Sequence, residues 1–71
     1  MKHNYINLEP KFKVGKIYED EFNRTYRFKY KGNLYEFDEV MYDEKRGKFI
    51  TYDKNIRLTV MEARHLKPIW N

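Results

Sequence analysis

The 71-residue chain contains no cysteine, no serine and no glutamine, and its only alanine is Ala63. The absence of cysteine excludes a disulfide framework, a thiolate nucleophile and the usual cysteine-rich zinc site. Covalent catalysis would therefore have to use a threonine, a lysine or a carboxylate. Packing alone must hold the fold together, which suits a reducing, intracellular setting.

Other signals of function are missing as well. No apolar run is long enough for a signal peptide or a membrane-spanning helix. The three glycines are dispersed, so no phosphate-cradling loop is present. The two histidines, His3 and His65, lie near opposite ends of the chain and have no partners at metal-ligand spacing. We expect a soluble cytoplasmic protein with no metal, no cofactor and no membrane partner.

The small size of the chain limits what it can build. Ordering 71 residues costs on the order of 100 kcal/mol, and offsetting this cost takes roughly 4,000 Å² of buried apolar surface. Most of the seven tyrosines and five phenylalanines must therefore serve as core. Little volume is left for a cleft that could bring carboxylates together for acid and base catalysis. We expect a protein that is not an enzyme.

Residues 24–42 carry the clearest structural pattern, because aromatic and charged residues alternate on both sides of Gly32-Asn33. Such alternation is typical of half-buried strands, and Gly-Asn is the signal of a two-residue hairpin turn. If Lys31 pairs with Leu34, aromatic residues face one another and opposite charges face one another. A slip of one residue would destroy this match. The predicted pairs are Tyr30 with Tyr35, Phe28 with Phe37, Lys29 with Glu36 and Arg27 with Asp38.

Shorter strands are expected on either side of this hairpin. Residues 12–18 form a first strand with Gly15 at a bend or bulge. After the hairpin, residues 48–52 return as a fourth strand, and residues 53–55 form a loop. Residues 56–60 then alternate as a fifth strand with one buried face.

The pattern changes to a helical one near the C-terminus. Thr59 and Glu62 have the spacing of a capping box, which predicts one helical turn over residues 61–65. Pro68 stops this turn because it lacks an amide proton. A brief last strand then contains Trp70, which we expect to close the bottom of the core.

The hairpin YKGNLYEF and the ending HLKPIW, in this order of elements, resemble the SH3-like small β-barrels. The resemblance covers residues 12–70 and implies only a fold, since no ligand-binding positions carry over. An OB-like barrel is the nearest alternative. We expect a mostly β protein with an N-terminal arm at residues 1–11. Residues 12–71 form one small barrel of five to six strands with one short helical turn near the C-terminus.

The excess positive charge lies in the first half of the chain. Residues 1–35 hold eight basic against four acidic residues, whereas residues 36–71 hold seven of each. Basic residues interleaved with aromatics attract phosphates and stack bases, although some of these side chains have partners within the predicted hairpin. The burial of Tyr5 and of several other tyrosines is left open. The candidate binding residues are Lys13, Lys16, Arg27, Lys29, Lys31, Tyr18, Tyr42 and Tyr52.

Two binding functions remain. The first is a protein-directed modulator that uses exposed tyrosines and a sheet edge. The alternative is a small barrel that binds DNA or RNA through the basic first half of the chain. Lysine, asparagine, isoleucine, tyrosine and phenylalanine are abundant, a bias that bacteria of low G+C content would also show. This composition resembles that of small accessory proteins of bacteriophages with A/T-rich genomes. That resemblance implies a host enzyme or complex as the partner, met in the host cytoplasm.

Overall fold

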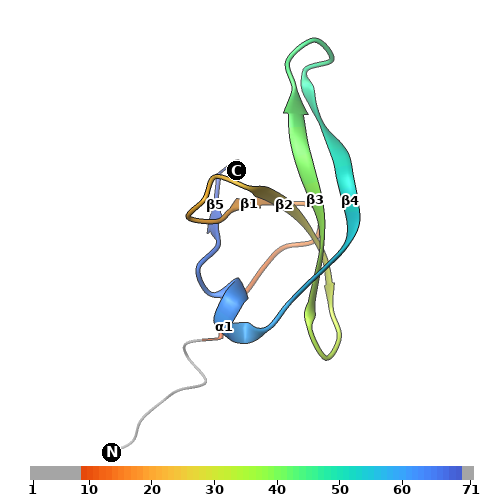
Figure 1. Ribbon diagram of the computed structural model, residues 1–71. Coiled ribbons are helices and arrows are strands. Elements are labelled where there is room, and N and C mark those ends of the chain that lie inside the picture. Colours follow the sequence, from red (N-terminus) through yellow and green to blue (C-terminus); the bar gives the residue numbers. More distant parts are fainter. Residues whose placement is uncertain (1–8, 70–71) are drawn as a thin grey trace, which may run out of the picture.

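Alternating aromatic and charged residues build a five-stranded antiparallel sheet in the computed structural model, which describes residues 9–69. The strands follow one another across the sheet in the order β4-β3-β2-β1-β5, so only β5 leaves the sequential order. Figure 1 shows the helix beside the lower part of the sheet. The elements are β1 (Ile17–Glu19), β2 (Thr25–Lys31), β3 (Tyr35–Asp43), β4 (Lys48–Leu58), α1 (Val60–Ala63) and β5 (Lys67–Pro68). The expected mostly β fold with one short helical turn near the C-terminus is confirmed.

An aromatic core lies on one face of the sheet, which we call the core face. Its strand residues are joined by Ala63 and Leu66 from the helix and the segment after it. The ring of Phe12 covers the cluster, with ring centroids 4.7 Å from Tyr18 and 5.3 Å from Phe37. Edge-to-face packing of this kind adds to the burial of apolar area. The strand residues of the core are Tyr18, Tyr26, Phe28, Tyr35 and Phe37.

The central hairpin keeps the predicted register in the part away from the turn and loses it beside the turn. Phe28 faces Phe37, as expected, and Arg27 faces Asp38. A β-bulge lies between Phe28 and Tyr30, and it shifts every pair nearer the turn. The predicted pairs Tyr30 with Tyr35, Lys29 with Glu36 and Lys31 with Leu34 are therefore wrong. Tyr30 faces Glu36, and Lys31 faces Tyr35.

The bulge also changes the side-chain partners. The Nζ atom of Lys29 lies 3.3 Å from Oδ1 of Asp38 and donates a 3.0 Å hydrogen bond to the carbonyl oxygen of Lys54. That Oδ1 atom is buried and has no hydrogen-bond partner within residues 9–69, so the contact between Lys29 and Asp38 is an ion pair without hydrogen-bond geometry. Glu36 is paired instead with Arg57, at 3.4 Å.

Two strand predictions need correction. The expected loop at residues 53–55 is wrong, because β4 runs without a break from Lys48 to Leu58 and absorbs the irregularity as shifts in its pairing with β3. The expected start of the first strand at Phe12 is wrong too. The amide of Lys16 donates to the carbonyl of Lys13 at 3.1 Å, and Gly15 adopts a φ of 84°, so a turn precedes the strand.

The helical turn near the C-terminus begins with the predicted cap. Thr59 caps α1, since its hydroxyl accepts from the amide of Glu62, and the carboxylate of Glu62 accepts from the amide of Thr59. This is the expected capping box. The following strand, β5, pairs with β1 through Pro68 and Lys67. No helix within residues 9–69 has the length and apolarity needed to cross a membrane.

Several expectations fall outside the described residues, namely those on His3, Tyr5 and Trp70 and most of the expected arm at residues 1–11. Within this N-terminal segment, Pro10 is half-buried, and its carbonyl oxygen accepts a 3.2 Å hydrogen bond from the hydroxyl of Tyr35.

Candidate functional site

The face of the sheet opposite the aromatic core, here called the outer face, carries a second set of buried side chains. Ile17 pairs with Arg27, and Thr25 pairs with Val40. These residues alternate with core residues along their strands, so their side chains project from the other side. The exposed fractions of Ile17 and Val40 are only 7% and 1%, yet neither residue belongs to the core cluster. The sheet is therefore partly covered on both faces.

The cover on the outer face comes from the β3–β4 hairpin, which continues past the rest of the sheet. Strand β2 pairs with β3 only as far as Val40, so residues 41–50 project as a two-stranded ribbon, which we call the arm. Figure 1 shows the arm rising beyond β1 and β2. On it, Tyr42 faces Phe49, and their rings meet edge to face at 5.1 Å.

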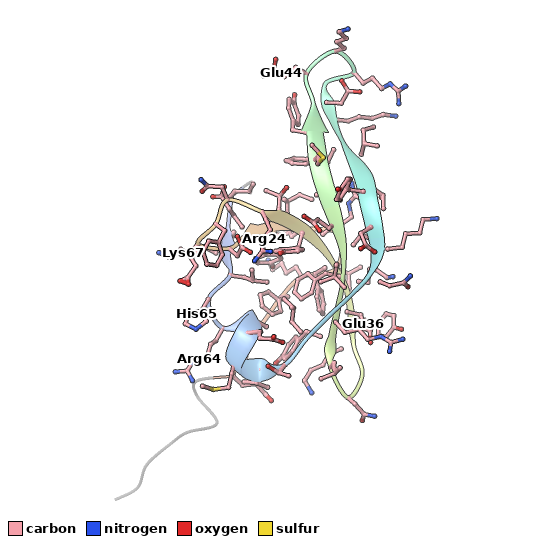
Figure 2. The ribbon with its side chains drawn as sticks, in the orientation of Figure 1. Arg24, Glu36, Glu44, Arg64, His65 and Lys67 are labelled. Atoms are coloured by element: carbon pink, nitrogen blue, oxygen red, sulfur yellow. The ribbon has the colours of Figure 1, made fainter. Side chains whose placement is uncertain are left out.

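The tip of the arm is a tight turn. The amide of Gly47 donates a 2.8 Å hydrogen bond to the carbonyl of Asp43. The carboxylate of Asp43 accepts from the amides of Lys45 and Arg46 at 3.0 and 3.3 Å. Gly47 has a φ of 67°, which disfavours residues with a Cβ atom. Figure 2 places Glu44 at this tip.

Between the arm and the first strands lies a hollow of about 490 Å³, which we call the outer-face groove. Aromatic rings from the arm and an isoleucine from β1 form apolar walls, and two side chains bring positive charge. No carboxylate is among the lining residues. They are Gly15, Ile17, Arg27, Tyr42, Gly47, Lys48 and Phe49.

Arg27 is the half-buried cation of this groove. Its guanidinium donates to Oγ1 of Thr51 and to the carbonyl oxygen of Phe49, both at 3.4 Å, the long end of hydrogen-bond distances. Among residues 9–69 no carboxylate forms an ion pair with it. The other arginines on or beside the sheet differ, since Arg24, Arg46 and Arg57 each pair with a carboxylate within 3.5 Å.

Two further hollows lie near the helix, and both contain carboxylates. One, of about 420 Å³, separates an acidic wall from a basic wall. Figure 2 shows Arg64, His65 and Lys67 together on the basic side. The other hollow, of about 200 Å³, is lined in part by Asp20 and Glu62. The acidic wall of the larger hollow consists of Glu19, Asp20 and Glu21.

Asp20, which lines both of these hollows, is already engaged by the fold. Burial alone would raise its pKa, but hydrogen bonds from the backbone of Arg24 and Phe22 and from the side chains of Arg24 and Tyr26 lower it. A carboxylate held ionised by four such bonds stabilises its own loop and is poorly suited to accept a proton in catalysis. We therefore take the outer-face groove as the candidate functional site.

The structure brings only some of the predicted binding residues to this groove. Arg27 and Tyr42 line it, and Lys16 lies between Gly15 and Ile17, which also line it. Tyr52 is on β4 with 69% of its surface exposed.

The remaining predicted residues lie elsewhere. Tyr18 is buried in the core, and its hydroxyl oxygen accepts a hydrogen bond from the amide of Lys13. Lys31, at the far end of β2, holds its Nζ atom 5.4 Å from the ring centre of Tyr35. Lys29 contacts Asp38, as described above. The predicted basic surface is thus spread over the turn at residues 13–16 and the whole length of β2.

Besides two glycines, sequence reasoning missed three of the residues that line the groove, namely Ile17, Lys48 and Phe49. A signal for Phe49 was present, because pairing Tyr42 across the loop at residues 43–47 sets an aromatic residue opposite an aromatic residue. Lys48 had no comparable signal, since its neighbours on β1 and β2 come from distant parts of the sequence.

No three histidine or carboxylate side chains within residues 9–69 gather closely enough to hold a metal ion. Comparisons with models of protein families, with curated proteins and with solved structures found no match for this chain. The arm and the groove are therefore the features of this chain that bear on its function.

Proposed function

We propose that this protein is a non-enzymatic binding module, with the SH3-like strand arrangement that its sequence resembles, and that the arm engages a partner protein. Its composition, poor in alanine and rich in tyrosine and lysine, supports a phage-type accessory role in which the partner is a host enzyme or complex. Such a module acts by occupying a surface of its partner. The sheet supplies the base, and the arm carries exposed side chains beyond β1 and β2.

The observation that carries this proposal is the exposure of large apolar side chains on and beside the arm. The exposed fractions of Met41 and Tyr42 are 57% and 48%, and that of Tyr52 is 69%. Leaving these side chains in water contributes nothing to the stability of the fold. Large apolar side chains exposed in this way favour a site of protein contact, and tyrosine and methionine are enriched in such contacts.

Nucleic-acid binding is the rival function, and the placement of the basic residues gives it less support. A nucleic-acid backbone requires several cations along one track. Lys29 is held by Asp38 and by the carbonyl of Lys54, and Lys31 lies over Tyr35, near the turn at the end of the sheet opposite the arm. Of the remaining predicted cations, Arg27 lines the groove, and Lys16 lies between two residues that line it.

Site-specific crosslinking tests the proposal. A photoreactive amino acid replaces Tyr52, and a matched variant carries it at Asn33, an exposed position in the turn opposite the arm. Each protein is irradiated in lysate of the cells from which it comes, with and without nuclease. We expect one saturable protein adduct from position 52, none from position 33, and no effect of nuclease. Equal adducts at both positions, or adducts that nuclease abolishes, would contradict the proposal.

A further inference from the structure

We propose that the outer-face groove binds an acidic segment of the partner protein, with a carboxylate of that segment pairing with Arg27. This inference rests on the proposed function and names the chemistry that the groove selects. The partner segment presents an aspartate or glutamate with apolar neighbours. The carboxylate meets the guanidinium, and the apolar neighbours meet Tyr42, Phe49 and Ile17.

The hydrogen bonding of Arg27 is the first support. A guanidinium carries several N–H donors in a fixed fork that matches both oxygens of a carboxylate. Arg27 uses Nη1 and Nη2 for only two contacts, both at 3.4 Å. Its remaining donors have no protein acceptor among the residues that the structure describes. A half-buried guanidinium with unused donors is suited to a bidentate carboxylate.

The charge of the groove is the second support. Arg27 and Lys48 line it, and no aspartate or glutamate lines it. The hollows beside the helix, in contrast, contain carboxylates next to their basic side chains. Apolar walls lower the local dielectric and strengthen the attraction of a bound anion to both cations. The groove is therefore electrostatically complementary to an acidic ligand, as the two other hollows are not.

The geometry favours a protein carboxylate over the phosphates of a nucleic acid. The groove holds two lining cations, and the arm closes it on one side. A nucleic-acid strand would need a longer row of basic side chains to release enough counterions. A single acidic side chain with apolar neighbours matches one arginine framed by Tyr42, Phe49 and Ile17.

Selection from a random peptide display library tests this without knowledge of the partner. The library is selected against the wild-type protein, and the enriched peptides are then titrated against Arg27→Met. The control is Arg64→Met, which removes the same charge from an exposed arginine whose Nη1 contacts only Met61 Sδ among the described side chains. We expect enrichment of aspartate or glutamate with apolar neighbours. Loss of the Arg27 pair should weaken binding about tenfold or more, and the control should change it little.

A second variant guards against loss of folding, because Arg27 also contacts β4. Lys48→Glu changes an exposed residue at the rim of the groove and leaves the contacts of Arg27 in place. It should weaken the same peptides, and raising the salt concentration should reduce the difference. Enrichment of neutral or basic peptides, or equal binding by the wild type and both groove variants, would overturn the inference.

The remaining outcomes separate this inference from the proposed function. A crosslinked protein partner at Tyr52, together with no preference for acidic peptides, would leave the proposed function standing and remove the role of Arg27. Binding of a labelled single-stranded oligonucleotide that Arg27→Met and Lys48→Glu both weaken, with no acidic peptide enriched, would replace both proposals by nucleic-acid recognition.

Discussion

The hydroxyl of Tyr26 donates a 3.1 Å hydrogen bond to Oδ2 of Asp20 and so ties β2 to the loop that precedes it. The other carboxylate oxygen accepts from the amides of Phe22 and Arg24, both at 2.9 Å. The Nε atom of Arg24 completes the set at 2.9 Å from Oδ2. Asn23 adopts a left-handed φ of 67° inside this loop. One carboxylate therefore organises the connection between β1 and β2.

The first prediction concerns acid stability. The four hydrogen bonds lower the pKa of Asp20 below its ordinary value of 3.8, against the effect of burial, which raises it. A lowered pKa in the folded state stabilises the fold fully above the unfolded value, and this stabilisation is lost as the pH falls through the folded value. In Asp20→Asn the free energy of unfolding should be about 1–3 kcal/mol lower at neutral pH, and it should depend less on pH in the acid range. Urea unfolding at a series of acid pH values measures the free energy of unfolding of the wild type and of the variant. If it falls in parallel with pH in the two proteins, Asp20 is not the group responsible.

The second prediction concerns alkaline stability. Burial, together with the hydrogen bond to Asp20 and its charge, raises the pKa of Tyr26 from 10.0 to about 12. The folded state then holds the phenol proton more tightly than the unfolded state does. Stability is retained below pH 10 and lost as the pH rises toward about 12, by about 3 kcal/mol in total at about 1.4 kcal/mol for each pKa unit.

Tyr26→Phe is the matched variant for this effect. It should be less stable at neutral pH by about 1 kcal/mol, because one hydrogen bond is lost. Above pH 10 its stability should fall less steeply than that of the wild type. Chemical unfolding at a series of alkaline pH values, with tyrosinate absorbance as a second signal, measures the difference. An equally steep fall in Tyr26→Phe would assign the alkaline transition to another tyrosine.

The third prediction concerns the capping box. Thr59 accepts from the amide of Glu62 at 3.2 Å and begins a helix of only four residues. Thr59→Ala should destabilise the protein by about 1 kcal/mol, whereas Thr59→Asp should retain most of the stability, because aspartate caps as well as threonine does. Hydrogen exchange should be faster at Ala63 and Leu66 in the alanine variant. An unchanged exchange rate at both amides would show that packing alone holds this turn.

The sequence predicts those features that depend on short-range patterns along the chain. The pairing of Phe28 with Phe37 follows from period-two alternation, and the cap at Thr59 follows from spacing. The bulge beside Lys29 does not follow in this way. It sets Tyr30 opposite Glu36 and Lys31 opposite Tyr35, a pairing of aromatic with charged residues that the alternation in the sequence does not predict. The continuity of β4 through Asp53 depends on irregular pairing with β3, which polar residues in the sequence do not reveal.

The candidate site was likewise predictable only in part. Arg27 and Tyr42 stood out in the sequence as a basic and an aromatic residue, but their meeting depends on how the arm lies relative to β1 and β2. The burial of Ile17 and Val40 on the outer face depends on that placement too. Alternation assigns side chains to faces, whereas the twist of a long hairpin over its own sheet is a tertiary property.

The pairing of β5 with β1 has a consequence for the order of assembly. Tyr18 pairs with Pro68, 50 positions further along the chain, whereas β1, β2 and β3 each pair with the next strand across a short connection. Closing a long loop carries a larger entropy loss than closing a short one, and distant contacts slow the search for the native state. The hairpins can therefore form by local diffusion. We therefore expect the capture of the C-terminal strand to come late and to limit the rate at which the whole chain folds.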